Sequence, residues 1–264
     1  MLPRRELGRT GLSVSPIGLG TVKFGRATGV RYPTRFSIPD DAAAARLLAI
    51  ASERGVNLLD TAPAYGESEE RLGRILIGQR DRWVLCTKAG EEFDAQSGKS
   101  SFDFSAPGIT ASVERSLHRL GVDALDVVLL HSDGRDEWIL RDSEAWEALQ
   151  RLRERGIIRA AGISTKSPEG AMLAATMCDV VMVTLNLRER ADLPAIEAAR
   201  LAGAGILIKK ALASGWLDAV ETTGIDPVER SLSFALGTPG VSSVIIGTID
   251  PDHLAHNIDA AARV

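Results

Sequence analysis

Cysteine is nearly absent from this sequence. The chain has 264 residues and only two cysteines, Cys86 and Cys178, both in or beside apolar segments. Two such residues are too few for a disulfide-stabilised scaffold, and their apolar settings predict buried thiols rather than a disulfide or a metal pair. We therefore expect a protein that functions in a reducing compartment.

Long apolar runs and an excess of positive charge are also missing. No run approaches the roughly 18 apolar residues of a membrane span, and the first six residues, MLPRRE, begin no apolar signal region. The formal net charge of -4 gives no polybasic surface for nucleic acid. With 45% hydrophobic and 25% charged residues, the chain has an ordinary globular composition. We expect a cytoplasmic protein with neither a membrane nor a nucleic-acid partner.

The glycine-rich fingerprint of dinucleotide-binding Rossmann folds does not occur between the first predicted strand and its helix. Short apolar runs alternate instead with helical patterns of about 10–15 residues, which is typical of a parallel sheet. The predicted strands cover residues 16–21, 56–60, 82–88, 125–131, 157–164, 180–185, 206–208 and 241–246.

Eight strand–helix units in a chain of this length predict a closed (β/α)₈ TIM barrel, in the α/β class, that forms one domain over residues 1–264. Residues 4–14 precede the first unit and predict a β-hairpin with its turn at Arg9 and Thr10. Segments 22–39 and 91–105 are predicted to be loops. The chain ends just after the last predicted helix, which indicates a short C-terminal tail.

Polar side chains follow three of the predicted strands. Asp60 ends the strand at 56–60, Tyr65 lies on the loop behind it, Lys88 ends the next strand, and His131 ends the one after. Because the carboxyl ends of parallel strands meet at one rim of a barrel, we expect these four side chains to lie together as catalytic residues.

The four side chains suit proton transfer to a carbonyl oxygen. A free tyrosine has a pKa of about 10, and a lysine ammonium nearby would favour the phenolate and lower the pKa of Tyr65. The carboxylate of Asp60 would hold Lys88 charged and oriented, and His131 could bind a substrate oxygen. This set can protonate a carbonyl oxygen while a hydride reaches the carbon, or run the oxidation of an alcohol in reverse.

Two other functions are open at this point. Lys88 or Lys209 could form a Schiff base in an aldolase on the same barrel, or the chain could be a non-catalytic subunit that binds a cofactor. We expect no metal, because Asp133, Asp136 and His131 do not have the spacing of metal ligands.

A series of motifs then runs through nearly the whole chain: LGRTGL at 7–12, GLGT at 18–21, DTAPAYG at 60–66, TK at 87–88, LH at 130–131, GIS at 162–164 and IIGT at 245–248. Through these motifs the sequence resembles the aldo-keto reductase family. The catalytic Asp, Tyr, Lys and His of that family fall on Asp60, Tyr65, Lys88 and His131. The resemblance implies an oxidoreductase that reduces aldehydes or ketones, or a sugar or alcohol dehydrogenase.

The resemblance also implies a nicotinamide cofactor extended across the rim, NADP(H) by family habit and NAD(H) as the alternative. The nicotinamide ribose would lie near Gly20, Thr21 and Asp60, and the carboxamide near Ser164, Thr165 and Asn186. Gly247, Thr248 and the start of the last helix, with His253 and Asn257, would hold the phosphates and adenosine, because a helix N-terminus attracts anions.

The sequence departs from the family pattern along this cofactor path. Lys209 and Lys210 stand where many members place a tyrosine against the nicotinamide, and they are expected to contact the cofactor instead. Met182 replaces a glutamine, His256 replaces a glutamate, and His253 stands where an arginine often binds the 2′-phosphate of NADP. These departures predict a weaker preference for NADP than arginine-bearing relatives have.

Overall fold

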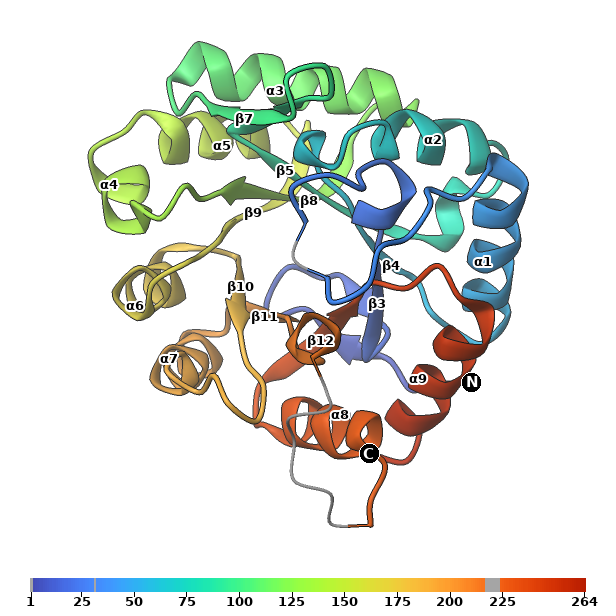
Figure 1. Ribbon diagram of the computed structural model, residues 1–264. Coiled ribbons are helices and arrows are strands. Elements are labelled where there is room, and N and C mark those ends of the chain that lie inside the picture. Colours follow the sequence, from blue (N-terminus) through green and yellow to red (C-terminus); the bar gives the residue numbers. More distant parts are fainter. Residues whose placement is uncertain (1, 31, 217–223) are drawn as a thin grey trace.

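Eight parallel strands close into a barrel in the computed structural model, which describes residues 2–30, 32–216 and 224–264 (Figure 1). The strands pair in the order β10-β11-β12-β3-β4-β5-β8-β9, so the predicted (β/α)₈ barrel is confirmed. Their bounds are β3 (Ile17–Gly20), β4 (Leu58–Asp60), β5 (Val84–Ala89), β8 (Leu125–His131), β9 (Ile158–Ser164), β10 (Val180–Thr184), β11 (Gly205–Lys209) and β12 (Val241–Ile246).

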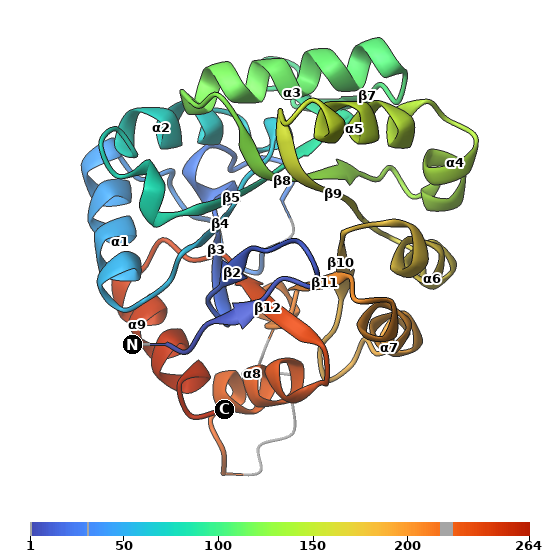
Figure 2. The ribbon, with the colours of Figure 1, turned by 180° about the vertical axis from the view of Figure 1, so that it is seen from behind.

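Helices surround the barrel (Figures 1 and 2). Several begin at side-chain caps, since Ser105, Ser167, Asp226 and Asp250 each accept a hydrogen bond from a backbone N–H of the helix they precede. The helices are α1 (Asp41–Glu53), α2 (Ser68–Ile75), α3 (Ala106–Leu120), α4 (Asp136–Arg141), α5 (Ala145–Glu154), α6 (Pro168–Met177), α7 (Leu193–Ala202), α8 (Pro227–Gly237) and α9 (Pro251–Ala261). The 3-10 turns are η1 (Val22–Phe24), η2 (Pro63–Tyr65), η3 (Arg80–Arg82) and η4 (Ala213–Gly215).

The predicted N-terminal hairpin is present and covers one end of the barrel (Figure 2). It consists of the antiparallel strands β1 (Arg5–Glu6) and β2 (Ser13–Val14). Its Leu7, Leu12 and Val14 are buried in the same apolar cluster as residues from the barrel interior. Because apolar side chains fill the barrel interior at this end, the interior is accessible from the opposite rim, where the strands end.

Two predictions about local structure were wrong. Segment 91–105 was predicted as a loop, but it contains a second hairpin, β6 (Glu91–Asp94) and β7 (Lys99–Phe102). The segment after His131 contains the extra helix α4 before α5, although only one helix was expected between two successive strands. The strands β6 and β7 and the helix α4 are too short to show a clear hydrophobic period in the sequence. Strand pairing and tertiary packing decide their structure instead.

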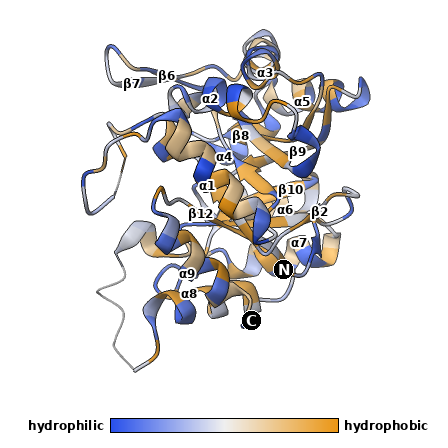
Figure 3. Cartoon of the chain, turned by 90° about the vertical axis from the view of Figure 1, so that its right-hand side faces the viewer, coloured by the Kyte–Doolittle hydropathy of each residue, from blue (hydrophilic) through white to orange (hydrophobic). Residues whose placement is uncertain are grey.

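A second apolar cluster fills the space between the barrel and the helices. Hydrophobic residues gather on the strands and the inner sides of the helices, as Figure 3 shows. Cys86 and Cys178 are buried free thiols, as predicted. Within the described ranges, no helix combines the length and the apolar character needed to cross a bilayer.

The contact between α2 and α3 gives a test of this packing. A Cβ added at Gly73 of α2 would lie 2.0 Å from the carbonyl oxygen of Arg119. Gly73→Ala should therefore lower the free energy of unfolding by about 1–3 kcal/mol, measured by urea denaturation. Gly237→Ala, at the end of α8, is the control because its Cβ would meet nothing within 4 Å. The helix propensity of alanine should leave that control as stable as the parent or up to about 1 kcal/mol more stable. Equal losses in both variants would contradict the close approach at Gly73.

Candidate active site

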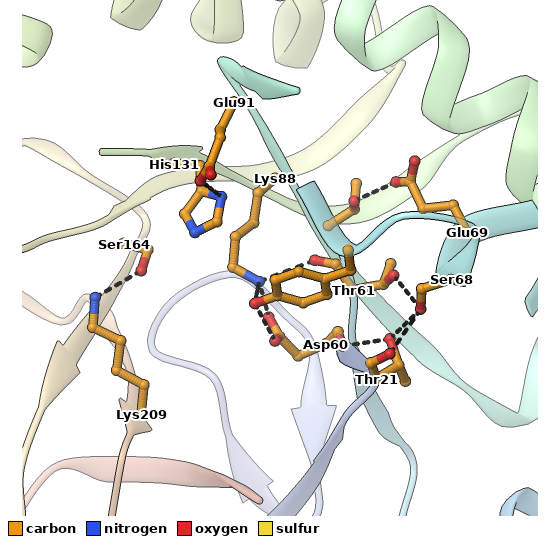
Figure 4. Close-up of polar contacts among 12 residues, drawn as sticks. Thr21, Asp60, Thr61, Ser68, Glu69, Lys88, Glu91, His131, Ser164 and Lys209 are labelled. Carbon is orange, nitrogen blue, oxygen red and sulfur yellow. Dashed lines mark hydrogen bonds and ion pairs between the residues drawn. The ribbon is translucent and has the colours of Figure 1, made fainter. Parts of the chain in front are cut away.

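Lys88 is the centre of a buried polar cluster at the open rim of the barrel (Figure 4). Its side chain is 1% exposed, and its Nζ donates to Asp60 Oδ1 at 2.5 Å, to the Thr61 carbonyl at 3.0 Å and to Tyr65 Oη at 3.0 Å. An ammonium has three N–H donors, so each donor of Lys88 has an acceptor. The ammonium is therefore held in one position.

Local backbone structure brings Asp60 and Tyr65 to this lysine. Asp60 ends β4, whose parallel register with β5 places it beside Cys86, two residues before Lys88. The 3-10 turn η2 then turns the chain so that Tyr65 comes back over the rim. Gly66 has a φ of 62° and lies so close to Gly25 that a Cβ would be 2.3 Å from its carbonyl oxygen. Only glycine fits there, so the motif after Asp60 is fixed by backbone geometry as well as by chemistry.

The pKa of Tyr65 differs from our expectation. Burial raises the pKa of Tyr65, the carboxylate of Asp60 adds to the increase, and the ammonium of Lys88 lowers it without reversing the net shift. Burial also opposes the charge on Lys88, but Asp60 and Tyr65 raise the pKa of Lys88 above its usual value. At neutral pH the site therefore holds a protonated phenol beside an ammonium, which is the state needed to donate a proton.

His131 completes the predicted four residues, with a partner that the sequence analysis missed. Its Nδ1 lies 2.9 Å from Oε2 of Glu91, the first residue of β6. Its ring packs edge-to-face against the Tyr65 ring, with 6.2 Å between the ring centres. Burial lowers the pKa of His131 even though Glu91 opposes this effect. The available signal was position, because Glu91 follows a strand end as Asp60 does.

A cavity of about 1320 Å³ opens beside these residues. Asp60, Tyr65, Lys88 and His131 all line it. So do most of the residues expected to contact a cofactor: Gly20, Ser164, Thr165, Lys209, Lys210, Gly247, Thr248, His253 and Asn257. The barrel thus brings side chains from β3 round to α9 to one continuous space.

Thr21 and Asn186 do not line this cavity. The hydroxyl of Thr21 donates to the Asp60 carbonyl at 3.0 Å, so Thr21 holds the catalytic strand end in place. The amide of Asn186 donates to Glu189 Oε2 at 2.8 Å and to the Lys210 carbonyl at 3.2 Å, which fixes the loop after β10. Both side chains are buried and act through their neighbours.

At the far end of the cavity, the start of α9 is already capped. The carboxylate of Asp250 accepts from the backbone N–H groups of Asp252 and His253. The hydroxyl of Thr248 accepts from the Asp250 N–H at 3.1 Å, while the His253 side chain is 76% exposed. Side chains rather than free backbone N–H groups must therefore meet an anion at this position.

Tyr32 is a second tyrosine in the cavity that the sequence analysis did not select. It comes from the long segment 22–39, and its hydroxyl lies 3.1 Å from the position of a Cβ on Gly247. The Nζ of Lys23 lies 4.2 Å from the centre of its ring. Burial and the charge of Asp60 raise the pKa of Tyr32 to about 12, so this phenol is also protonated at neutral pH.

Comparisons with known proteins identify relatives of this chain. The aldo/keto reductase family matches residues 16–230. A solved structure of a Pseudomonas aeruginosa protein assigned to the aldo-keto reductases has 52% identity over 98% of this chain and 94% of that one, with a TM-score of 0.88. An uncharacterised oxidoreductase of Bacillus subtilis, YqkF, is 29% identical over 98% of this chain and 90% of its own length. A D-threo-aldose 1-dehydrogenase of a Pseudomonas species is 29% identical over 66% of this chain and 56% of its own length.

The barrel, its rim residues and these matches define a class of protein, the nicotinamide-dependent oxidoreductases built on a (β/α)₈ barrel. Within that class, the chain belongs to the aldo/keto reductase family. It is an NAD(P)H-dependent enzyme that interconverts carbonyl compounds and alcohols.

The contact between Glu91 and His131 can be tested by titration. The Glu91 carboxylate raises the pKa of His131 against the effect of burial. Glu91→Gln should therefore move the His131 titration to lower pH, measured by NMR of the imidazole ring. Glu92→Gln is the control, because Glu92 accepts from Ser112 and Arg115 and does not face the histidine. An unchanged His131 pKa in Glu91→Gln would contradict the pairing.

Proposed function

We propose that this enzyme reduces small hydroxylated aldehydes or ketones, with Tyr65 as proton donor and Lys88, Asp60 and His131 as its partners. The observation that carries the proposal is the 3.0 Å hydrogen bond from Lys88 Nζ to Tyr65 Oη at the wall of the cavity. A panel of aldehydes, ketones and aldoses, assayed in both directions with both nicotinamide cofactors, tests it.

The residues at the rim fit a nicotinamide dinucleotide. The cavity continues from the catalytic residues to the start of α9, and Gly247 lines it without a side chain. Ser164, Thr165 and Lys209 offer polar groups for the nicotinamide end. Thr248, His253 and Asn257 offer hydroxyl, imidazole and amide groups for the phosphates and adenosine. The bound cofactor supplies or accepts the hydride.

Proton transfer follows from the arrangement around Tyr65. The hydroxyl of Tyr65 accepts from Lys88 at 3.0 Å and donates a long hydrogen bond of 3.5 Å to Asp60 Oδ2. This donor bond is weak, so the phenol proton can be given instead to the oxygen of a substrate carbonyl that lies closer in the cavity. As that proton leaves, negative charge develops on the phenol oxygen, and the ammonium of Lys88 stabilises it. Asp60 stabilises the charged form of Lys88 throughout. In the oxidation direction, the phenolate takes the proton of an alcohol.

The state of His131 supports a hydroxylated substrate. The 2.9 Å contact between Nδ1 and Glu91 Oε2 favours the neutral tautomer with its proton on Nδ1, which leaves Nε2 as an acceptor toward the cavity (Figure 4). Such an atom can accept a hydrogen bond from a hydroxyl next to the carbonyl group. Aldoses carry that hydroxyl, and one relative is a D-threo-aldose 1-dehydrogenase.

The aldolase alternative requires a neutral lysine amine. Lys88 does not provide one, since its raised pKa keeps it an ammonium with three acceptors. Lys209 is the remaining candidate, because burial lowers its pKa to about 7. Borohydride trapping in the presence of substrate should give no adduct at either lysine, and an adduct at Lys209 would favour the aldolase. A non-catalytic subunit would bind the cofactor and show negligible turnover across the whole panel.

The His253 side chain bears on the preference between the two cofactors, and the two thiols bear on the cellular compartment. We propose NADP(H) as the cofactor, with a modest preference over NAD(H), because an exposed imidazole is a weaker partner for the 2′-phosphate than a guanidinium. The two free thiols suit a reducing compartment such as the cytoplasm.

Removal of the phenol tests the proton donor. Tyr65→Phe should lower carbonyl reduction by about 10²–10⁴-fold, because general acid catalysis is lost, and should leave the dissociation constant of the cofactor nearly unchanged. Steady-state kinetics and fluorescence titration measure the two quantities. Turnover near that of the parent enzyme would show that another group donates the proton.

Addition of a charge tests the place of the 2′-phosphate. His253→Arg should tighten NADPH binding by about 1–3 kcal/mol, the scale of a hydrogen bond to a charged group, and should leave NADH binding little changed. His118→Arg on α3 adds the same charge at an exposed position away from the cavity and serves as the control. An equal change for both cofactors in His253→Arg would place His253 away from the 2′ position.

A further inference from the structure

Lys209 lies across from Lys88 at the end of β11 (Figure 4), and both line the cavity with Tyr65. Its Nζ donates to the hydroxyl of Ser164 at 2.9 Å and to the backbone carbonyl of Thr165. Both acceptors are neutral, and within the described ranges no carboxylate forms an ion pair with this amine. Lys209 therefore differs from Lys88, which contacts a carboxylate directly.

The charged groups that face Lys209 come from every element packed around it. They are Lys210 at the end of its own strand, Lys88 on β5, His131 on β8, Lys166 after β9, Asp136 on α4 and Asp192 before α7. Burial lowers the pKa of Lys209 to about 7, and the nearby lysines add to this while Asp136 opposes it. Near neutral pH, Lys209 thus exchanges between an ammonium and a neutral amine.

The same region must receive the reactive ring of the cofactor. Hydride transfer requires the reacting atoms to approach within about 3–3.5 Å, so the ring must lie next to a carbonyl group that is bound at Tyr65. Ser164, Thr165 and Lys209 are joined by hydrogen bonds and form a polar part of the wall of the cavity that Tyr65 also lines. The oxidised nicotinamide ring carries a positive charge and the reduced ring is neutral, so a charge on this wall distinguishes the two forms.

We propose that Lys209 is a positioning residue that senses the oxidation state of the nicotinamide, and that its ammonium form favours the neutral reduced ring over the cationic oxidised ring. The inference rests on the cofactor binding proposed above. By linkage, binding of the oxidised cofactor drives the proton of Lys209 into solvent, and binding of the reduced cofactor does not. Acidic conditions thereby favour carbonyl reduction, and alkaline conditions relieve the bias against alcohol oxidation.

The first test measures the dissociation constants of NADP⁺ and NADPH between about pH 6 and about pH 9 by fluorescence titration. The ratio of the oxidised to the reduced constant should fall as pH rises through the titration of Lys209. A shift of one unit in the pKa of Lys209 on binding NADP⁺ corresponds to about a tenfold change in this ratio. The 2′-phosphate is common to both forms, so its own titration cancels. A ratio that is constant with pH would overturn the inference.

Two substitutions assign the effect to Lys209. Lys209→Met should give a low ratio that no longer changes with pH. Lys209→Arg should keep the ratio high across the range, because a guanidinium stays charged. Persistence of the parent pH dependence in either variant would overturn the inference. Lys210→Met is the matched control. It should retain a pH-dependent ratio, with its midpoint at slightly higher pH because Lys210 lowers the pKa of Lys209.

A second measurement uses the unmodified enzyme and so does not depend on the folding of a variant. Isothermal titration calorimetry near pH 7, in phosphate and in Tris, gives the number of protons released on binding. NADP⁺ should release more protons than NADPH, and equal release would overturn the role of Lys209. Failure of both forms to bind at all would instead contradict the proposed function.

Discussion

The buried ion pair between Lys88 and Asp60 is the interaction on which the rest of the site depends. Removing two charges from water is costly, and such a pair persists only when its remaining hydrogen-bonding groups are also satisfied. Here the third and fourth members are Thr61 and Tyr65, so the ammonium has no unused donor. Tyr65 is thereby fixed beside a permanent positive charge, which would stabilise the phenolate in the proton transfer proposed above.

The two lysines on opposite walls of the cavity have pKa values that are shifted in opposite directions. On the catalytic wall, contact with Asp60 keeps Lys88 charged, and burial of Tyr65 keeps the phenol protonated. On the facing wall, Lys209 donates to neutral acceptors, and burial together with the neighbouring lysines lowers its pKa. This difference in charge between Lys88 and Lys209 suits the proposed reaction, in which the proton comes from the phenol and the hydride from the cofactor.

The two hairpins lie at opposite ends of the barrel, where one packs against the apolar interior and the other contributes a residue to the cavity rim. The hairpin β1–β2 closes the end where the strands begin with apolar side chains that pack against the barrel interior. The hairpin β6–β7 stands at the other end and brings Glu91 to His131. Insertions between strands and helices can thus change the substrate side of the site without disturbing the closed sheet.

The sequence by itself determined the barrel and the grouping of Asp60, Tyr65, Lys88 and His131 at its open rim. The alternation of apolar strands and helices is a local pattern, and parallel strands place Asp60, Lys88 and His131 at one rim whatever the details of packing. It could not show Glu91 beside His131, Tyr32 over Gly247, or the structural roles of Thr21 and Asn186, because those contacts join segments that no local period connects. Nor could it give the raised pKa of Tyr65 or the lowered pKa of Lys209. Burial and the sum of charges from several strands set these values, and both exist only once the barrel has closed.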